Sequence, residues 1–415
     1  MTSAVRRAGW NLADQVLSSG TNAALSFLVA RSVDTSAFGG FAVAFTVFAL
    51  LVGVSRALAT SPLGIRYSDA APSGYADASS AAVGTAFILG VVAGVGCLMA
   101  GAWVGGSAGQ ALIALGVVFP SLLMQDAWRY VFFAAARPAA ATLNDAVWAI
   151  VQLGIVIALL TTGVSTAGPL VLAWGGSAAA AALLGVRQAG TWPRPRRAGR
   201  WLRDHRNLTG YLIAEFGTLQ GSQQGALLVI ATVGSLEAIG ALRGVQVLLG
   251  PTTILAVAAF SFAVPEFSRR RASLTSRQWT LGALGVSAFV SAAGFCWGAL
   301  FLLAPDEVGR SLLGETWPGT SDILFASIVG QMGAAVAIGP AVVLYAMDRA
   351  PVTLSVHATL APLLFIGGVG GVMLAGAEGA AWGFTIAFWA VVPLWLFRLR
   401  REAAALGEVQ RVAQP

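Results

Sequence analysis

The sequence predicts an all-α integral membrane protein with about twelve transmembrane helices in two six-helix lobes. Hydrophobic residues make up 57% of the 415 positions and charged residues only 10%, whereas an ordinary soluble domain carries roughly 25% charged residues. The apolar residues fall in long blocks, and a helix crosses a bilayer with about 20 of them. The 50 glycines suit transmembrane helices, because small side chains let helix backbones approach closely.

The apolar blocks are separated by short connections that hold most of the charged residues, and these connections leave no room for a sizeable domain outside the membrane. The first block has the length of a full crossing and lacks a small-residue cleavage site, so we expect a retained first helix rather than a signal peptide. The predicted helices span residues 10–30, 37–60, 81–103, 110–132, 142–162, 169–186, 208–231, 238–264, 279–303, 320–345, 352–374 and 379–397.

The placement of arginine predicts the orientation. All 25 basic residues are arginine, and seven of them lie in the connection 187–206. Apart from Arg31 and Arg310, the arginines of the loops and tails lie on the side that holds both termini, and basic loops stay cytoplasmic. We therefore expect both termini in the cytoplasm and contacts with anionic membrane lipids. The arginines lack the interleaved aromatic residues of a nucleic-acid surface, so we expect no nucleic-acid partner.

The connection in the middle of the chain divides it into two halves. We expect a six-helix lobe at 1–187, a basic cytoplasmic linker at 188–206, a second lobe at 207–398 and a cytoplasmic tail at 399–415. Sliding one half onto the other by 201 positions aligns Asp14 with Glu215 and the turn 37–39 with 238–240. Because each half has an even number of crossings, the two lobes would be parallel repeats related by a pseudo-twofold axis along the membrane normal.

Four motifs resemble those of a known superfamily. The segment 240–251 (GALRGVQVLLGP), continued by VPEFSRR at 264–270, is similar to the eighth helix of bacterial polysaccharide exporters of the multidrug/oligosaccharidyl-lipid/polysaccharide (MOP) superfamily. The segments SAFG at 36–39, LLGETW at 312–317 and GAEGAAWG at 376–383 resemble the turns before helices two, ten and twelve of that superfamily. Each motif is loose, and the resemblance rests on their order within the 6+6 layout.

The resemblance implies two lobes around a V-shaped cavity that opens alternately to either side. The branch it indicates, the polysaccharide or O-antigen repeat-unit flippases, moves polyprenyl-pyrophosphate-linked oligosaccharides across the bacterial cytoplasmic membrane. It implies a role in polysaccharide or lipopolysaccharide biosynthesis of the cell envelope. The expected partners are the lipid-linked oligosaccharide, H⁺ or Na⁺ as coupling ion, and proteins of polysaccharide assembly.

Three arginines inside apolar blocks are candidates for binding an anionic cargo, because a guanidinium can donate two hydrogen bonds to a phosphate. Arg56 and Arg129 lie near the inner ends of their helices, so either could instead extend to the lipid headgroups. Arg129 also follows Asp126 by three residues and could pair with it. Arg243 shares a helix face with Gln246, which we add as a candidate cargo-binding residue.

Two carboxylates are candidates for ion coupling, because an ionisable group inside a membrane is costly and often functional. Glu215 lies about 10 Å past the predicted helix start, and a structural hydrogen bond is its alternative role. Asp14 belongs to a polar stripe with Asn22, a further candidate cargo-binding residue. This stripe could line the cavity or pack between helices, and Asp14 itself could be a solvated acid at the helix start.

A polar stripe of the fifth predicted helix could offer an aromatic, sugar-binding surface, but a packed contact between helices is the interpretation we favour. The stripe consists of Asn144, Asp145, Trp148 and Gln152.

The sequence lacks the motifs of an enzyme. It has no G-x-x-x-x-G-K-[ST] phosphate loop for ATP and no His/Cys ligand group, so we expect no cofactor, no metal and no catalytic residue. The main alternative function is an H⁺- or Na⁺-coupled multidrug antiporter of the same superfamily, and the minor one a membrane glycan polymerase or glycosyltransferase. The charge of the cavity distinguishes the antiporter from the flippase: carboxylates would suit cationic drugs, and net positive charge would suit a lipid diphosphate.

Overall fold

The computed structural model describes residues 3–67, 71–269, 274–347 and 349–412. The secondary structure of these residues consists of helices, and no strand occurs among them. Within the described residues, eight helices are long and apolar enough to cross a membrane, or nine if the bent pair Leu236–Leu248 and Gly250–Phe260 is one crossing. The predicted all-α membrane class is confirmed, and the number of twelve crossings stays a prediction.

The described chain forms two compact units, one comprising Met1–Gln224 with Leu312–Thr316 and the other Gly225–Ser311 with Trp317–Pro415. We describe each unit by itself. The predicted lobe limits at 187 and 207 stay a prediction.

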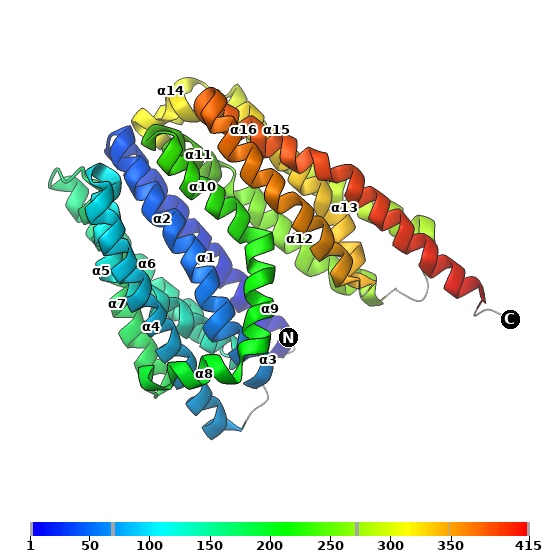
Figure 1. The fold of residues 1–415 in the computed structure, drawn as a ribbon, viewed down its shortest axis with the longest axis horizontal. Coiled ribbons are helices and arrows are strands. Elements are labelled where there is room, and N and C mark those ends of the chain that lie inside the picture. The colour runs from blue at the N-terminus through cyan, green and yellow to red at the C-terminus, as the bar shows by residue number, and fades with distance from the viewer. Residues whose placement is uncertain (1–2, 68–70, 270–273, 348, 413–415) are drawn as a thin grey trace. The chain divides into compact units, whose positions relative to one another are not determined.

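The first unit is built around α5, which packs against α2, α4, α6 and α7, while α1 packs on α6 (Figure 1). Asp34 caps α2 by accepting a hydrogen bond from the amide of Ala37 at 2.7 Å. The elements of this part of the chain are α1 (Ser3–Ser32), α2 (Thr35–Ser55), the π-helical turn η1 (Arg56–Thr60), α3 (Ser61–Tyr67), α4 (Pro72–Val104), α5 (Gly106–Ala134), α6 (Pro138–Thr161), α7 (Ala167–Ala189), the 3₁₀ turn η2 (Pro195–Arg197), α8 (Ala198–Asp204), α9 (Arg206–Phe216), the π-helical turn η3 (Gly217–Gly221) and α10 (Ser222–Val233), which continues into the second unit.

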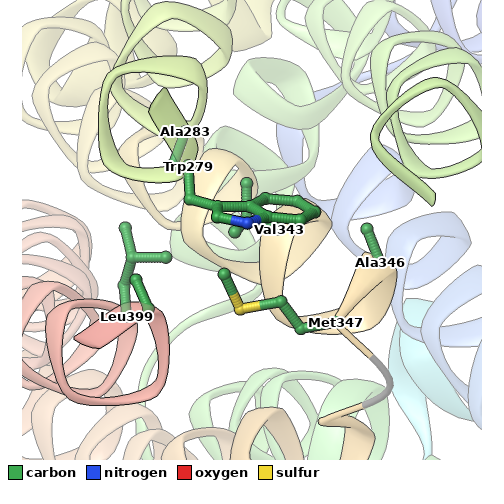
Figure 2. Packing of buried hydrophobic residues seen from close by; sticks show 7 residues of the cluster. Trp279, Ala283, Val343, Ala346, Met347 and Leu399 are labelled. Atoms are coloured by element: carbon green, nitrogen blue, oxygen red, sulfur yellow. The ribbon is translucent and has the colours of Figure 1, made fainter. Parts of the chain in front are cut away.

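The second unit has a similar plan, with α15 at its centre packing against α11, α12, α13 and α16. Trp279 of α13 packs against Val343 and Met347 at the end of α15 and against Leu399 of α16 (Figure 2). The remaining elements are α11 (Leu236–Leu248), α12 (Gly250–Arg269), α13 (Ser276–Leu303), α14 (Asp306–Leu313), η4 (Gly314–Thr316), α15 (Trp317–Ala346) and α16 (Ala350–Val412), in which two helices meet at a kink formed by Ala375 and Gly376.

Two predicted segments differ in detail from the structure. The linker 188–206 contains the short helix α8, and Trp201 and His205 are buried there although the arginine-rich sequence indicates a solvated loop. The crossing predicted at 208–231 is divided by the π-helical turn η3.

The hairpin of α4 and α5 depends on glycine. Gly105 and Gly106 form its turn with φ of +68° and +57°, a conformation that glycine adopts without steric cost. Along the hairpin the two backbones touch: a Cβ added to Gly94 would lie 2.5 Å from the carbonyl oxygen of Gly116, and one added to Gly116 would lie 2.7 Å from that of Gly94. No side chain fits between these backbones, so the glycines define how closely the helices pack.

We expect Gly94→Leu to destabilise the protein by about 1–3 kcal/mol, because the added side chain forces α4 and α5 apart. Thermal unfolding of the purified protein in detergent measures the effect. The matched control is Gly96→Leu, since Gly96 is exposed on the same helix with no atom within 4 Å of an added Cβ. Equal melting temperatures for the two variants would contradict this account of the hairpin.

Candidate functional site

One guanidinium joins three helices inside the first unit. Arg129 of α5 donates from Nη2 and Nε to the same carboxylate oxygen of Asp14 in α1, at 2.5 and 2.8 Å. Its Nε also lies 3.1 Å from a carboxylate oxygen of Asp145 in α6. Asp14 is fully buried, so the alternative of a solvated acid at the helix start is wrong.

A second ion pair joins α5 to the π-helical turn η1. Arg56, the first residue of η1, donates from Nε to Asp126 at 3.0 Å and from Nη2 to the other carboxylate oxygen at 2.6 Å. Such a fork-to-fork pair fixes direction as well as distance. Asp126 therefore binds an arginine of another helix, and Arg129, three residues further along, pairs with other acids.

The carboxylates of this network are more deeply buried than the guanidiniums. The side chain of Arg56 is 33% exposed against 9% for Asp126, and that of Arg129 is 12% exposed against 0% for Asp14 and 3% for Asp145. The arginines therefore carry most of the accessible surface of the network. With all five groups ionised, three carboxylates and two guanidiniums leave the network with one excess negative charge.

Amides hold the buried end of the network. Gln125 of α5 donates to Asp145 at 2.7 Å and to Asn144 at 3.3 Å, and Asn144 donates to the backbone oxygen of Ala181 in α7 at 2.7 Å. The indole of Trp148 donates to the backbone oxygen of Trp174 at 3.1 Å. The interpretation of the α6 stripe as a packed contact is confirmed by these bonds and by the burial of the stripe.

The network borders a cavity of about 420 Å³ that lies within the first unit. Two aromatic rings cover its arginines: the Cζ of Arg56 lies 4.8 Å from the ring centre of Tyr130, and that of Arg129 lies 5.5 Å from the ring centre of Phe133. The cavity is lined by Asp14, Ser18, Ser19, Asn22, Arg56, Arg129, Tyr130 and Phe133.

A second cavity of about 250 Å³ shares Arg56 and Tyr130 with the first and contains Glu215 in its wall. Both π-helical turns reach it, through Arg56 of η1 and Gln220 of η3. Its two sides touch where Phe216 of α9 packs on Gly53 of α2, which leaves no room for a Cβ at that glycine.

Four of the residues predicted to bind cargo or couple ions therefore meet at one cavity, namely Asp14, Asn22, Arg56 and Arg129, and Glu215 borders the adjoining one. The other two lie in the second unit. There Arg243 of α11 donates to Gln246 at 3.4 Å, which confirms that they share a helix face. The roles of all these residues remain proposals.

The face of α5 that builds the site was not predicted from the sequence. Asp126, Arg129, Tyr130 and Phe133 are spaced at i, i+3, i+4 and i+7, the pattern of one helix face. The pattern is visible in the sequence, although the spacing of Asp126 and Arg129 alone indicates only a pair of neighbours along the helix.

Comparison with solved structures shows the class of fold. The chain superimposes on an inward-facing multidrug resistance MATE family transporter of the MOP superfamily with a TM-score of 0.71 and 14% identity, over 95% of this chain and 96% of that one. The lipid II flippase MurJ in an inward closed conformation gives a TM-score of 0.66 and 11% identity, over 96% and 90% of the two chains. The fold is thus that of MOP superfamily transporters.

A MOP superfamily transporter from Pyrococcus furiosus is also similar, with a TM-score of 0.59 and 13% identity over 97% of this chain and 96% of that one. For that protein, the reverse polarity of the binding pocket suggests a different function. No protein-family model and no curated protein sequence matches the chain. The resemblance to MOP transporters is confirmed at the level of the fold, and the polysaccharide branch stays a prediction.

We expect Arg129→Met to destabilise the protein by about 3–5 kcal/mol, because it leaves Asp14 and Asp145 buried without their cation. The matched control is Asp77→Asn, which removes the partner of Arg194 in a pair whose side chains are 58% and 47% exposed; an exposed pair contributes at most about 1 kcal/mol. Thermal unfolding in detergent compares the two. A loss for Arg129→Met no larger than that of the control would show that the buried network does not stabilise the bundle.

Proposed function

We propose that this protein is a transporter that moves a polyprenyl-pyrophosphate-linked oligosaccharide across the bacterial cytoplasmic membrane by alternating access, and that it is not an enzyme. The observation that carries the proposal is the pair of guanidiniums, Arg56 and Arg129, which are more exposed than their carboxylate partners and line a polar cavity. The MOP fold supports transport as the activity.

The chemistry of the cavity suits a diphosphate. Arg56 binds Asp126 through Nε and Nη2, so the hydrogens of Nη1 are available for the oxygen atoms of a cargo. A guanidinium keeps its charge at any physiological pH and matches phosphate geometry. The hydroxyls of Ser18 and Ser19 and the amide of Asn22 supply further polar groups for the headgroup or sugar. The polyprenyl tail would stay in the lipid, so the protein shelters only the polar part from the hydrocarbon.

The excess carboxylate favours a second candidate function. Asp14, Asp126 and Asp145 outnumber the two arginines, and a net negative cluster would attract a cationic drug or a coupling cation. An H⁺- or Na⁺-coupled multidrug antiporter is therefore the alternative, and it is consistent with the same fold. The two candidates differ in which groups face the cargo: guanidiniums in the first and carboxylates in the second.

The further partners are proposed on the same basis. Exposed arginines of the linker, among them Arg196, Arg200 and Arg203, would lie at the cytoplasmic face and bind anionic lipid headgroups. Trp192, which is 73% exposed, would sit at the membrane interface. Because the termini are predicted on the same side as this linker, both would be cytoplasmic. Proteins of polysaccharide assembly would contact the transporter at the membrane.

Transport by the reconstituted protein tests the cargo. In proteoliposomes we expect flipping of a fluorescent polyprenyl-pyrophosphate oligosaccharide, and a reduction of about 10–100-fold for Arg56→Ala, the effect of losing one or two charge-assisted hydrogen bonds of about 1.5–3 kcal/mol. Arg129→Ala and Arg243→Ala test the other two candidates. Arg200→Ala, an exposed arginine of the linker, is the control.

Two outcomes separate the functions. Uptake of a cationic dye with no flipping of the lipid-linked glycan would establish the antiporter. Flipping at the parent rate in all three arginine variants would contradict recognition of the diphosphate by these side chains.

Ion coupling is tested at the two carboxylates that border the cavities. We expect Glu215→Gln and Asp14→Asn each to weaken the dependence of flux on pH or on Na⁺, because an amide cannot bind and release the ion. The control is Glu237→Gln, an exposed carboxylate in the first turn of α11. An unchanged response to pH and Na⁺ in Glu215→Gln would remove Glu215 as a coupling residue.

A further inference from the structure

The linker helix α8 is bonded to the π-helical turn that carries Arg56. Trp201 of α8 is 5% exposed, and its indole Nε1 donates to the backbone oxygen of Leu58 at 3.1 Å. Leu58 lies within η1, two residues after Arg56. A side chain of the linker thus reaches the helix that supplies one of the two guanidiniums of the cavity.

The sequence of the turn explains why this carbonyl needs an outside donor. In an α-helix the oxygen of Leu58 would accept from the amide of residue 62, but that residue is Pro62 and has no N–H. The turn instead closes by the wider π-type bond from the amide of Ser61 to the oxygen of Arg56. Because an unpaired carbonyl is costly in a protein that crosses a membrane, the indole N–H of Trp201 stabilises the distorted turn.

Several contacts hold α8 in the position from which Trp201 can donate. The rings of Trp201 and Tyr67 stack with centroids 5.7 Å apart, and that of His205 lies 4.2 Å from Trp201. Before α8, the amide of Arg194 donates to the backbone oxygen of Ser80 in α4 at 2.9 Å. The linker is therefore attached at both its ends to the bundle that contains the cavity.

The π-helical turn decides which way Arg56 points. An extra residue in one turn rotates the helix before it relative to the helix after it by about 100°. With this rotation Arg56 meets Asp126 of α5, while Tyr67 at the end of α3 meets Trp201 and His205. In a regular α-helix the directions of these two contacts would differ from the observed ones by about 100° relative to each other.

We propose that Trp201 is a positioning residue for Arg56: by donating to Leu58 it maintains the π-helical turn and so directs the guanidinium toward the cavity. The proposal concerns the site of the proposed function, but it depends on the direction of Arg56 and not on the identity of the cargo. A substitution in the linker would then change the electrostatics of the cavity although the linker has no residue in its wall.

The test measures how the electrostatic potential in the cavity changes the reaction rates of charged thiol reagents. A single cysteine is placed there by Asn22→Cys in a chain carrying Cys97→Ala and Cys296→Ser, and its rates of reaction with an anionic and a cationic methanethiosulfonate are compared. Arg56→Ala in this background defines the ratio of rates without the guanidinium. We expect Trp201→Phe, which keeps a ring but removes the N–H donor, to shift the ratio at least threefold toward that value.

Trp192→Phe is the matched control, because Trp192 lies in the same linker and is 73% exposed; we expect the parent ratio. Pro62→Ala distinguishes positioning from stability, since it returns an amide donor to Leu58. We expect Pro62→Ala, alone and combined with Trp201→Phe, to shift the ratio toward the Arg56→Ala value, because the turn can then close as a regular helix and direct Arg56 away from Asp126. If Trp201→Phe alone does not fold, the ratio of reaction rates is measured in this double variant instead.

The proposal is overturned if Trp201→Phe lowers the melting temperature but leaves the reagent ratio at the parent value, or if the double variant restores the ratio together with the stability. In either case the role of Trp201 would be limited to donating a hydrogen bond to the backbone oxygen of Leu58. Failure of the parent protein to flip a lipid-linked glycan would overturn the proposed function and leave this measurement intact, because the reagents report on the cavity without any cargo.

Discussion

Neutralising two arginines within an apolar helix bundle is the constraint on which the first unit depends. A charged side chain in a membrane interior costs about 2.5–3.5 kcal/mol even on insertion scales, so each guanidinium requires a carboxylate from another helix. Arg129 takes Asp14 and Asp145, and Arg56 takes Asp126. These bonds join α1, α5, α6 and η1 and oppose the rotation of these elements about their own axes.

The same constraint limits what the cavity can bind. A guanidinium whose Nε and Nη2 are occupied by a carboxylate retains donors for one more partner, and its charge is largely balanced before any cargo arrives. Recognition of a phosphate would then depend on directed hydrogen bonds more than on net attraction. The third carboxylate makes the net charge of the network −1. Binding of one proton or one Na⁺ would make the network neutral. Cargo binding and ion binding would thus act on one set of side chains.

The sequence predicted what composition and periodicity determine and missed what depends on contacts between distant segments. Apolar blocks predicted the membrane class, and the polar face of the first helix grouped Asp14 with Asn22 but left open whether Asp14 is buried or solvated. The partner of Arg56 could not be predicted, since spacing along one helix identifies only neighbours at i±3 and i±4. Asp126 lies 70 residues away on another helix. The order of α8 was missed for a related reason: its arginines indicate solvent exposure, whereas its structure depends on burial of Trp201 against the turn after α2.

Helix contacts of two kinds divide the first unit into stiff and deformable parts. Between α4 and α5 the backbones touch at Gly94 and Gly116, and a seam of this kind cannot shift without collision, because no side chain can rearrange to absorb the movement. The second cavity is different: the regular hydrogen-bonding pattern is interrupted by η1 on one side and by η3 on the other. The turn η3 can return to an α-helical one by moving a single residue, whereas Pro62 prevents this at η1. The helix that carries Glu215 therefore bends at η3 at a lower cost than helices joined by a glycine seam. If the protein alternates its access, Glu215, which is proposed for ion coupling, lies beside the turn best able to move.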